Sequence, residues 1–197
     1  MAIERDLRLV HPAPRENRVV VPSEVLGTMI FVLTEIMMFA GFISAFNIAR
    51  ASVPVWPPPG QPRLPVEATA VNTLLLLVSG GLAWWAGRRF DRIGPTAARW
   101  PLRGAVLLGI GFVVLQGVEW VRLLGEGLTL SSSLHGAFFY MIVGAHAVHA
   151  VGGATVLAAL AIQMERGTLT SNVLWAGRLF WSFVVLLWPI LYWQVYL

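Results

Sequence analysis

The sequence predicts an all-α membrane protein with five transmembrane helices, and its composition is the first reason. Of the 197 residues, 57% are hydrophobic and only 12% are charged, whereas soluble domains carry about 25% charged residues. A soluble fold could not cover so much apolar surface with so few charges. The apolar residues also form continuous runs and do not alternate with polar ones, which favours helices over the strands of a barrel.

Five apolar runs are long enough to cross a bilayer, whose core of about 30 Å needs about 20 residues of helix. The first is interrupted only by Glu35, and the second contains no charged residue at all. The third ends near Glu119 and Arg122, the fourth contains two central histidines, and Arg178 lies near the start of the fifth. The predicted spans are 25–48, 68–87, 104–124, 134–163 and 174–197.

The basic residues predict the direction of these spans. All 14 are arginines, and eleven of them fall in the N-terminal tail, in the segment between the second and third spans, and around 166–178. Only Arg50, Arg63 and Arg122 belong to the two opposite loops. Because basic residues gather on the cytoplasmic side, the N-terminus is expected inside and the C-terminus outside. Residues 1–24 lack the apolar core of a signal peptide and are expected to form a cytoplasmic tail before the transmembrane domain, 25–197.

Several function classes are disfavoured. The net charge of +4 is spread over several loops without an aromatic and basic patch, so nucleic acid is not an expected partner. The absence of cysteine excludes disulfides, zinc ribbons and cysteine-ligated clusters. No pairing of a nucleophile with a base, no phosphate loop and no open metal site is visible. By itself the chain is therefore not expected to be catalytic or to bind a metal.

Glu35 lies within the apolar stretch FVLTEIMMFAGF, residues 31–42, near the middle of the first span. Its helical face carries Phe31, Met38, Phe39 and Phe42. Such surroundings disfavour a carboxylate, so the acid is expected to be largely protonated. Two interpretations stay open: a protonated acid hydrogen-bonded to a neighbouring helix, or a group that exchanges protons.

His146 and His149 lie three residues apart in GAHAVHAVGG, so they share a face near the middle of the fourth span. Their depth matches that of Glu35. We therefore expect Glu35 to meet one of them, directly or through one water. A haem or metal site would need a further ligand on a facing helix, so packed, hydrogen-bonded histidines are favoured over ligands.

Polar groups near the span ends give further candidates. Glu119 stands three residues before Arg122, which favours an interfacial ion pair and leaves a lipid-headgroup or partner contact as the alternative. Arg166 and Arg178, on the predicted inner side, are candidates for anionic headgroups, or they act only as topology signals. The segment VPVWPPPGQPRLP, residues 53–65, cannot continue a helix and is expected to be a stiff lid or a simple connector.

Several motifs occur in order on successive spans. They are TMIFVLTEIMMFAGF at 28–42, VWPPPG at 55–60, NTLLLLVSG at 72–80, LQGVEW at 115–120 and HGAFFYMIVGAHAVHAVGG at 135–153. Together they resemble subunit III of the haem–copper oxidases, in its five-helix form. The chain departs from the family pattern at FWSFVV, 180–185, where Ser182 and Val185 stand in place of the usual His and Asp, and at Gly87, which replaces a frequent His.

The resemblance implies a non-catalytic subunit of a cytochrome c or quinol oxidase. In the family, subunit III packs beside catalytic subunit I, in a complex with subunit II, and the haem and copper lie in the partner subunit. The resemblance also implies a V-shaped cleft that holds structural phospholipid, a role in maintaining proton uptake, and a buried, carbodiimide-reactive acid at the position of Glu35. The expected location is the inner membrane of a bacterium.

Three other functions are kept as alternatives. The five-helix form also resembles accessory subunits of nitric-oxide reductase systems. A proton-coupled transporter subunit would use Glu35, His146 and His149, but the sequence lacks the inverted repeat common in transporters. A haem-binding quinone oxidoreductase subunit would need more histidine ligands than the single His-x-x-His motif supplies.

Overall fold

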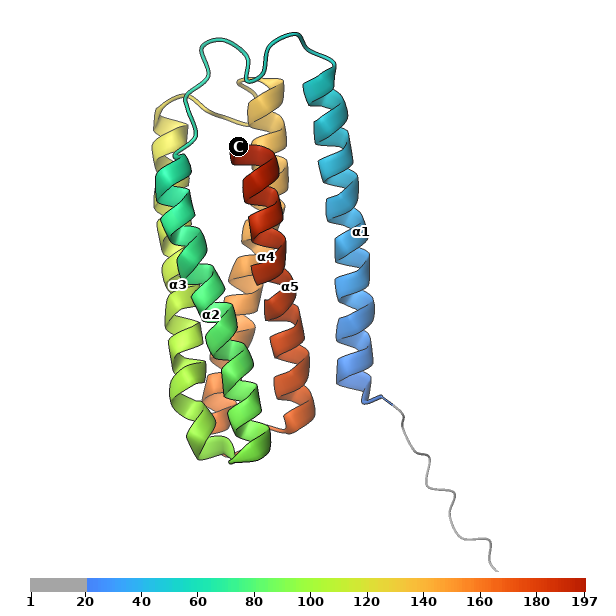
Figure 1. Ribbon diagram of the computed structural model, residues 1–197, viewed down its shortest axis with the longest axis vertical. Coiled ribbons are helices and arrows are strands. Elements are labelled where there is room, and N and C mark those ends of the chain that lie inside the picture. The colour runs from blue at the N-terminus through green and yellow to red at the C-terminus, as the bar shows by residue number, and fades with distance from the viewer. Residues whose placement is uncertain (1–20) are drawn as a thin grey trace, which may run out of the picture.

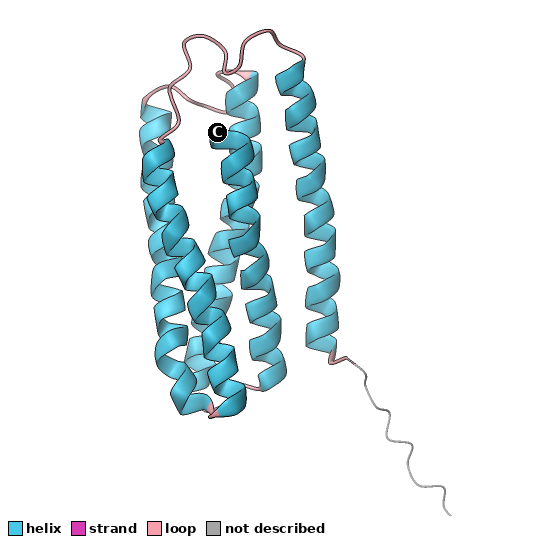
Figure 2. Ribbon diagram, in the orientation of Figure 1, coloured by secondary structure: helices cyan, strands magenta, loops and turns pink. Residues whose placement is uncertain are grey.

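The computed structural model describes residues 21–197, and the five predicted spans are five helices (Figure 1). Their bounds are α1 Ser23–Ala51, α2 Val66–Arg92, α3 Pro95–Gly125, α4 Leu134–Glu165 and α5 Ser171–Tyr196. Each is long and apolar enough to cross a membrane, and residues 21–197 contain no strand (Figure 2). The all-helical, five-span fold class is therefore confirmed.

The largest difference from the predicted spans is at the start of α3. The helix begins at Pro95, nine residues before the predicted start at 104. Proline is favoured at the first position of a helix, and Gly94, with φ of 122°, supplies a backbone conformation that other residues rarely adopt. Arg99 and Arg103 consequently lie on the first turns of α3. The predicted spans had placed them in the connection before this helix.

Helices α2 to α5 form a closed ring in which α2 and α4 each lie between α3 and α5 (Figure 1). Among the described helices, α1 contacts only α5 and α4, and it stands outside the ring. Successive helices run in opposite directions. We call the end with the α2–α3 and α4–α5 connections the arginine end, and the end with the α1–α2 and α3–α4 connections the loop end.

Trp181 is the centre of the ring. It is fully buried and donates a hydrogen bond of 3.1 Å to the hydroxyl of Ser79 on α2. A Cβ atom on Gly109 of α3 would lie 2.9 Å from the indole, and one on Gly153 of α4 would lie 2.6 Å from it. Both glycines are therefore needed for three helices to close on this one side chain.

A set of neutral hydrogen bonds, which we call the polar ladder, joins three of the ring helices, α2, α3 and α5. The Asn72 amide donates to the Phe112 carbonyl and the Gln116 amide oxygen, both at 3.2 Å, and Gln116 donates to the Tyr196 hydroxyl at 3.2 Å. Because the bilayer core offers no water to satisfy polar groups, such pairs hold neighbouring helices in one register. The ladder consists of Asn72, Thr73, Ser79, Gln116, Trp181, Trp188 and Tyr196.

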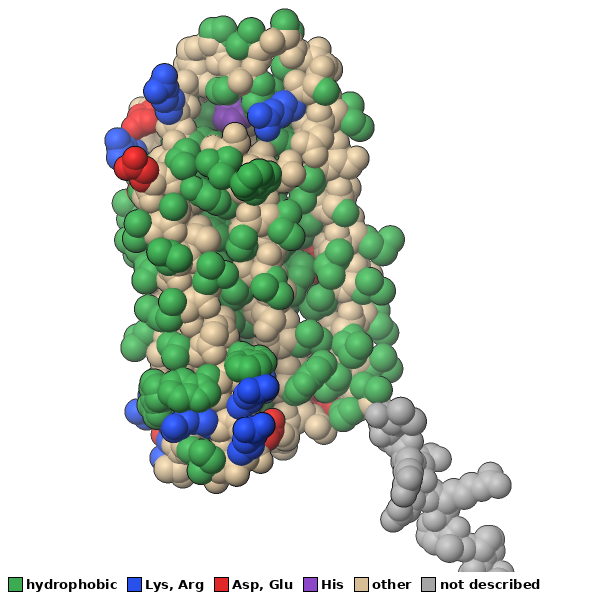
Figure 3. Space-filling view, viewed as in Figure 1, with side chains coloured by type: hydrophobic (Ala, Val, Ile, Leu, Met, Phe, Trp, Pro, Cys, Tyr) green, Lys and Arg blue, Asp and Glu red, His purple; other side chains and the backbone are tan. Residues whose placement is uncertain are grey.

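Basic side chains lie beside hydrophobic ones at the arginine end (Figure 3), and the hydrophobic partners of Arg88 and Arg89 are tryptophans. The guanidinium of Arg88 lies 3.9 Å from the centre of the Trp84 ring, a cation–π contact typical of an interfacial belt. Arg103 pairs with Glu165 at 2.9 Å. The predicted orientation remains a prediction, and the arginines of the N-terminal tail, residues 5 to 18, lie outside the described residues.

Candidate functional site

The structure brings Glu35 of α1 and His149 of α4 together. The Oε2 atom of Glu35 lies 3.0 Å from the Nε2 atom of His149, and their side chains are 15% and 13% exposed. The pair lies midway along both helices, far from either end of the bundle. No other hydrogen bond or ion pair joins α1 to another of the described helices.

Four phenylalanines surround the His149 ring, and we call them the phenylalanine cage. Phe31 and Phe39 come from the α1 face that carries Glu35, with ring centres 6.4 and 5.6 Å from that of His149. Phe180 and Phe183 of α5 lie at 6.3 and 6.2 Å. The cage removes water from the pair, so any charge separation between Glu35 and His149 occurs in apolar surroundings.

The position of the proton follows from the second nitrogen of His149. Its Nδ1 atom lies 2.7 Å from the Ala145 carbonyl oxygen, which can only accept, so Nδ1 carries a hydrogen. Nε2 of a neutral His149 is then an acceptor facing Glu35. A proton must separate the two atoms, either on Glu35 in a neutral pair or on Nε2 in an ion pair. Glu35 Oε2 makes no aligned hydrogen bond with the described residues, so the 3.0 Å contact is established by distance and not by hydrogen-bond direction.

His146 does not join this pair. It is 1% exposed and stacks on Trp188, with ring centres 4.8 Å apart and planes inclined by 28°. Neither of its ring nitrogens has a hydrogen-bond partner among the described residues. Glu35 and the two histidines therefore do not converge on one point, and residues 21–197 contain no cluster of three or more side chains able to hold a metal.

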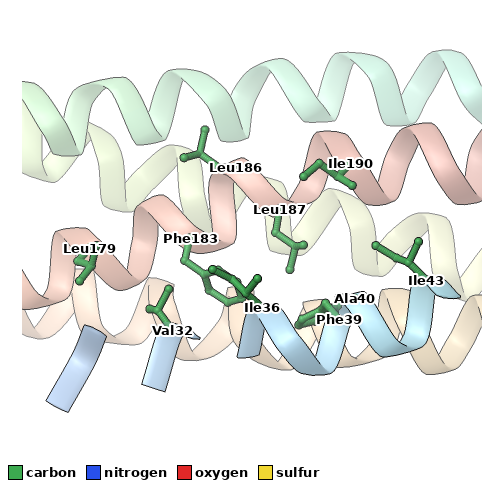
Figure 4. Close-up of a pocket in the computed structure, with 10 residues that line it drawn as sticks. All are labelled: Val32, Ile36, Phe39, Ala40, Ile43, Leu179, Phe183, Leu186, Leu187 and Ile190. Atoms are coloured by element: carbon green, nitrogen blue, oxygen red, sulfur yellow. The ribbon is translucent and has the colours of Figure 1, made fainter. Parts of the chain in front are cut away.

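An apolar groove runs between α1 and α5 beside the cage, with a cavity volume of about 440 Å³ (Figure 4). Phe39 and Phe183 belong both to the groove and to the cage, so they separate it from the Glu35–His149 pair. The groove follows from the isolation of α1, which contacts the ring along only two helices. Its lining is Val32, Ile36, Phe39, Ala40, Ile43, Leu179, Phe183, Leu186, Leu187 and Ile190.

The expected ion pair between Glu119 and Arg122 is absent. Arg122 instead pairs with Glu126, with 3.0 Å between Nε and Oε1. Glu126 follows the last residue of α3, four positions after Arg122 and facing solvent, where two exposed side chains meet easily. One carboxylate oxygen of Glu119 is buried without a partner among the described residues. Glu126 was not predicted as the partner of Arg122 from the sequence.

The other two headgroup candidates lie at the opposite end. Arg166 is exposed and follows the end of α4. Arg178 lies against Gly87 of α2, so closely that a Cβ atom there would overlap its guanidinium. The family's histidine at position 87 would therefore clash with this arginine.

The two departures on α5 also have a structural counterpart. Val185 is 4% exposed and fills the space over Gly80, where a Cβ atom would lie 2.8 Å from it. An aspartate at this position would place a carboxyl group against an apolar helix contact. Ser182 is half-buried. The same FWSFVV stretch supplies Phe180 and Phe183 to the cage. This contribution was not predicted from the sequence, although their three-residue spacing places them on one face.

The proline-rich segment between α1 and α2 packs onto the bundle. Trp56 lies edge-on to His135 at the start of α4, with ring centres 5.2 Å apart, and against Phe46 of α1 at 5.5 Å. Gln61 accepts a hydrogen bond of 3.4 Å from Ser132 in the α3–α4 connection. The segment thus covers the loop end and favours the interpretation as a lid over that as a simple connector.

Comparison with known proteins identifies relatives along almost the whole chain. Residues 15–197 match the family model for cytochrome c oxidase subunit III. Cytochrome c oxidase subunit 3 of Oryctolagus cuniculus is 32% identical over 179 residues, which cover 86% of this chain and 67% of that protein. The same subunit of Pongo abelii is 32% identical and that of Sus scrofa 30% identical, with the same coverage.

Proposed function

The chain belongs to the cytochrome c oxidase subunit III family, and on that premise we propose that it is the non-catalytic subunit III of a respiratory haem–copper oxidase. Its partners would be the catalytic subunit I, which holds haem and copper, and subunit II. The comparisons give no support to a nitric-oxide reductase subunit or a transporter. The membrane is proposed to be a bacterial inner membrane, although the relatives named above come from mammals.

Within that role, we propose that the Glu35–His149 pair takes up and releases a proton. The observation that carries this is the 3.0 Å contact of two titratable groups inside the phenylalanine cage. Because Nδ1 of His149 is committed to the Ala145 carbonyl, a proton passes between Oε2 and Nε2 without a change of tautomer. A pair used only for packing would not need two ionisable groups, since a neutral hydrogen bond costs less to bury.

The groove between α1 and α5 would receive the acyl chains of a structural phospholipid. Its lining is wholly apolar, and it runs along the middle of both helices, from Val32 to Ile43 on α1 and from Leu179 to Ile190 on α5. Arg166 and Arg178, at the arginine end, are the proposed headgroup contacts for anionic lipid. Glu119 and Arg122 lie at the other end, so they do not contribute to the same headgroup site.

The test is Glu35→Gln in the assembled complex. We expect an unchanged yield of complex containing haem and copper, with modestly slower proton uptake, because glutamine can donate to Nε2 of His149 but cannot release a proton. Infrared spectroscopy should show a protonated carboxyl band in the wild type that disappears in this variant.

Thr34→Val is the matched control, since the exposed Thr34 hydroxyl bonds only to the Phe31 carbonyl of its own helix. It should leave proton uptake and the carboxyl band unchanged. Loss of all oxidase activity in assembled Glu35→Gln complex would contradict a supporting role. Purification of the chain without any haem and copper subunit would contradict the proposed complex itself.

A further inference from the structure

We propose that Arg50, Arg63 and His135 form a binding site for a phosphate group at the loop end, supplied either by a lipid headgroup or by free phosphate. The three residues come from different segments: the end of α1, the proline-rich segment and the start of α4. All three line one pocket. The site lies apart from the Glu35–His149 pair, and it does not depend on the function proposed above.

The pocket has a volume of about 270 Å³ and lies under the proline-rich segment. Figure 3 shows a recessed histidine between basic side chains at this end of the molecule. Tyr196 and the residues beside it close the pocket from the end of α5. Besides the two arginines and His135, the lining consists of Trp56, Pro57, Pro62, Leu64, Val66, Val195, Tyr196 and Leu197.

The side chains that line the pocket carry positive charge and no negative charge. No aspartate or glutamate side chain lines it. Within the described part of the chain, neither Arg50 nor Arg63 takes part in a salt bridge. Two guanidinium groups in one concavity attract an anion, and the planar fork of arginine matches the oxygens of a phosphate.

His135 is the second, independent indication of a ligand. Its side chain is 3% exposed, and its Nδ1 atom has no hydrogen-bond partner among the described residues. Buried polar atoms are nearly always hydrogen-bonded, and leaving one unpaired is unfavourable. A phosphate oxygen in the pocket would accept a hydrogen bond from this nitrogen and remove that cost.

The walls are held in place before any ligand binds. Trp56 is fixed edge-on against His135, and the Tyr192 hydroxyl donates a hydrogen bond of 3.1 Å to the Val66 carbonyl. Such preorganisation lowers the entropy lost on binding. The apolar walls beside the basic groups also suit a phosphate that carries a glycerol and acyl chain, which is why the test separates lipid from free phosphate.

The test uses the full chain in its complex, reconstituted in nanodiscs of phosphatidylcholine. Inorganic phosphate is titrated while the ring nitrogen signal of His135 is followed by ¹⁵N NMR, assigned with His135→Asn. Separately, native mass spectrometry measures phosphatidylglycerol retained from mixed nanodiscs. We expect a saturable change of the His135 signal, retained phosphatidylglycerol, or both.

Arg63→Gln should weaken binding about fivefold, which corresponds to about 1 kcal/mol. Arg63 is exposed in a connection, so the variant should fold, and yield of complex verifies this. Arg122→Gln is the matched control because Arg122 is an exposed arginine at the same end outside the pocket, and it should bind as the wild type does. A response to phosphate alone identifies a free-anion site, and retention of lipid alone identifies a headgroup site. Absence of both, or equal weakening by Arg63→Gln and Arg122→Gln, would overturn the proposal.

Discussion

The ring helices and α1 are attached to the bundle in opposite ways. Helices α2, α3 and α5 are joined by the polar ladder, whose neutral groups donate and accept at fixed positions. Helix α1 is joined to α4 and α5 by the phenylalanine cage and by one pair of titratable groups. The ring is also closed around Trp181, whereas α1 has an open apolar groove along its contact with α5.

The two kinds of contact therefore have different roles. The neutral hydrogen bonds of the polar ladder stabilise the fold, and the Glu35–His149 pair consists of groups that can exchange a proton. Neutral hydrogen bonds in an apolar medium keep one arrangement near neutral pH, because none of their groups gains or loses a proton there. A glutamate and a histidine at contact distance have two proton arrangements of differing charge. The titratable pair stands at the most weakly held helix, where a change in charge disturbs the ring least.

The largest effect is expected from Trp181→Ala, which tests whether the ring depends on one side chain. Removing a fully buried tryptophan should lower the free energy of unfolding by about 3–5 kcal/mol, measured by SDS titration from bicelles. Trp193→Ala is the control, since Trp193 is 68% exposed. Equal losses from the two substitutions would show that Trp181 has no special place in the ring.

Asn72→Leu tests the polar ladder. It removes two hydrogen bonds between α2 and α3 and leaves the Gln116 oxygen unpaired, so a loss of about 1–2 kcal/mol is expected in the same titration. Thr28→Val, whose hydroxyl bonds only to the Glu24 carbonyl of its own helix, should be neutral. A neutral Asn72→Leu would mean that packing alone holds α2 against α3.

His149→Phe tests the attachment of α1. The substitution keeps an aromatic ring in the cage but leaves Glu35 without a partner, so α1 should be destabilised by about 1 kcal/mol. Hydrogen exchange should quicken at α1 amides and stay unchanged in α2 and α3. Faster exchange across the whole bundle would instead make His149 part of the ring's stability.

The smallest effect is expected from His146→Phe, one turn away. His146 has no hydrogen-bond partner among the described residues and stacks on Trp188, a role that phenylalanine can fill. We expect the free energy of unfolding to rise or fall by no more than about 0.5 kcal/mol, because the substitution leaves no hydrogen-bond partner unpaired. The free energies of unfolding of His146→Phe and His149→Phe are compared in the same titration. A loss for His146→Phe as large as that for His149→Phe would indicate that His146 has an unidentified partner.

The spans and the depth of the polar groups could be predicted from the sequence because both depend on local patterns. Apolar runs gave five helices, and counting residues placed Glu35 level with His146 and His149. The sequence could not predict which of the two histidines contacts Glu35, because both lie on one face of α4. The packing of α1 on α4 determines that it is His149. The early start of α3 was missed because arginines on its first turns end the apolar run without ending the helix.

The acidic partner of Arg122 on α3 also could not be predicted from the sequence. Arg122 has acidic neighbours both three residues before it and four after it, and helical spacing permits either. In the folded bundle Glu119 lies partly inward and Glu126 is exposed, so Arg122 pairs with Glu126. The phenylalanine cage also lay beyond sequence reasoning, because it joins residues about 150 positions apart on α1 and α5.

The isolation of α1 also orders events during synthesis. Of the five helices, α1 is translated before the others, and the two helices that it contacts, α4 and α5, follow after α2 and α3. Glu35 therefore enters the bilayer before His149, its contact among the described residues, is translated. A charged acid at this depth in the bilayer is costly, so the insertion of the fourth helix, which brings His149 beside Glu35, is the step that gives this acid its contact.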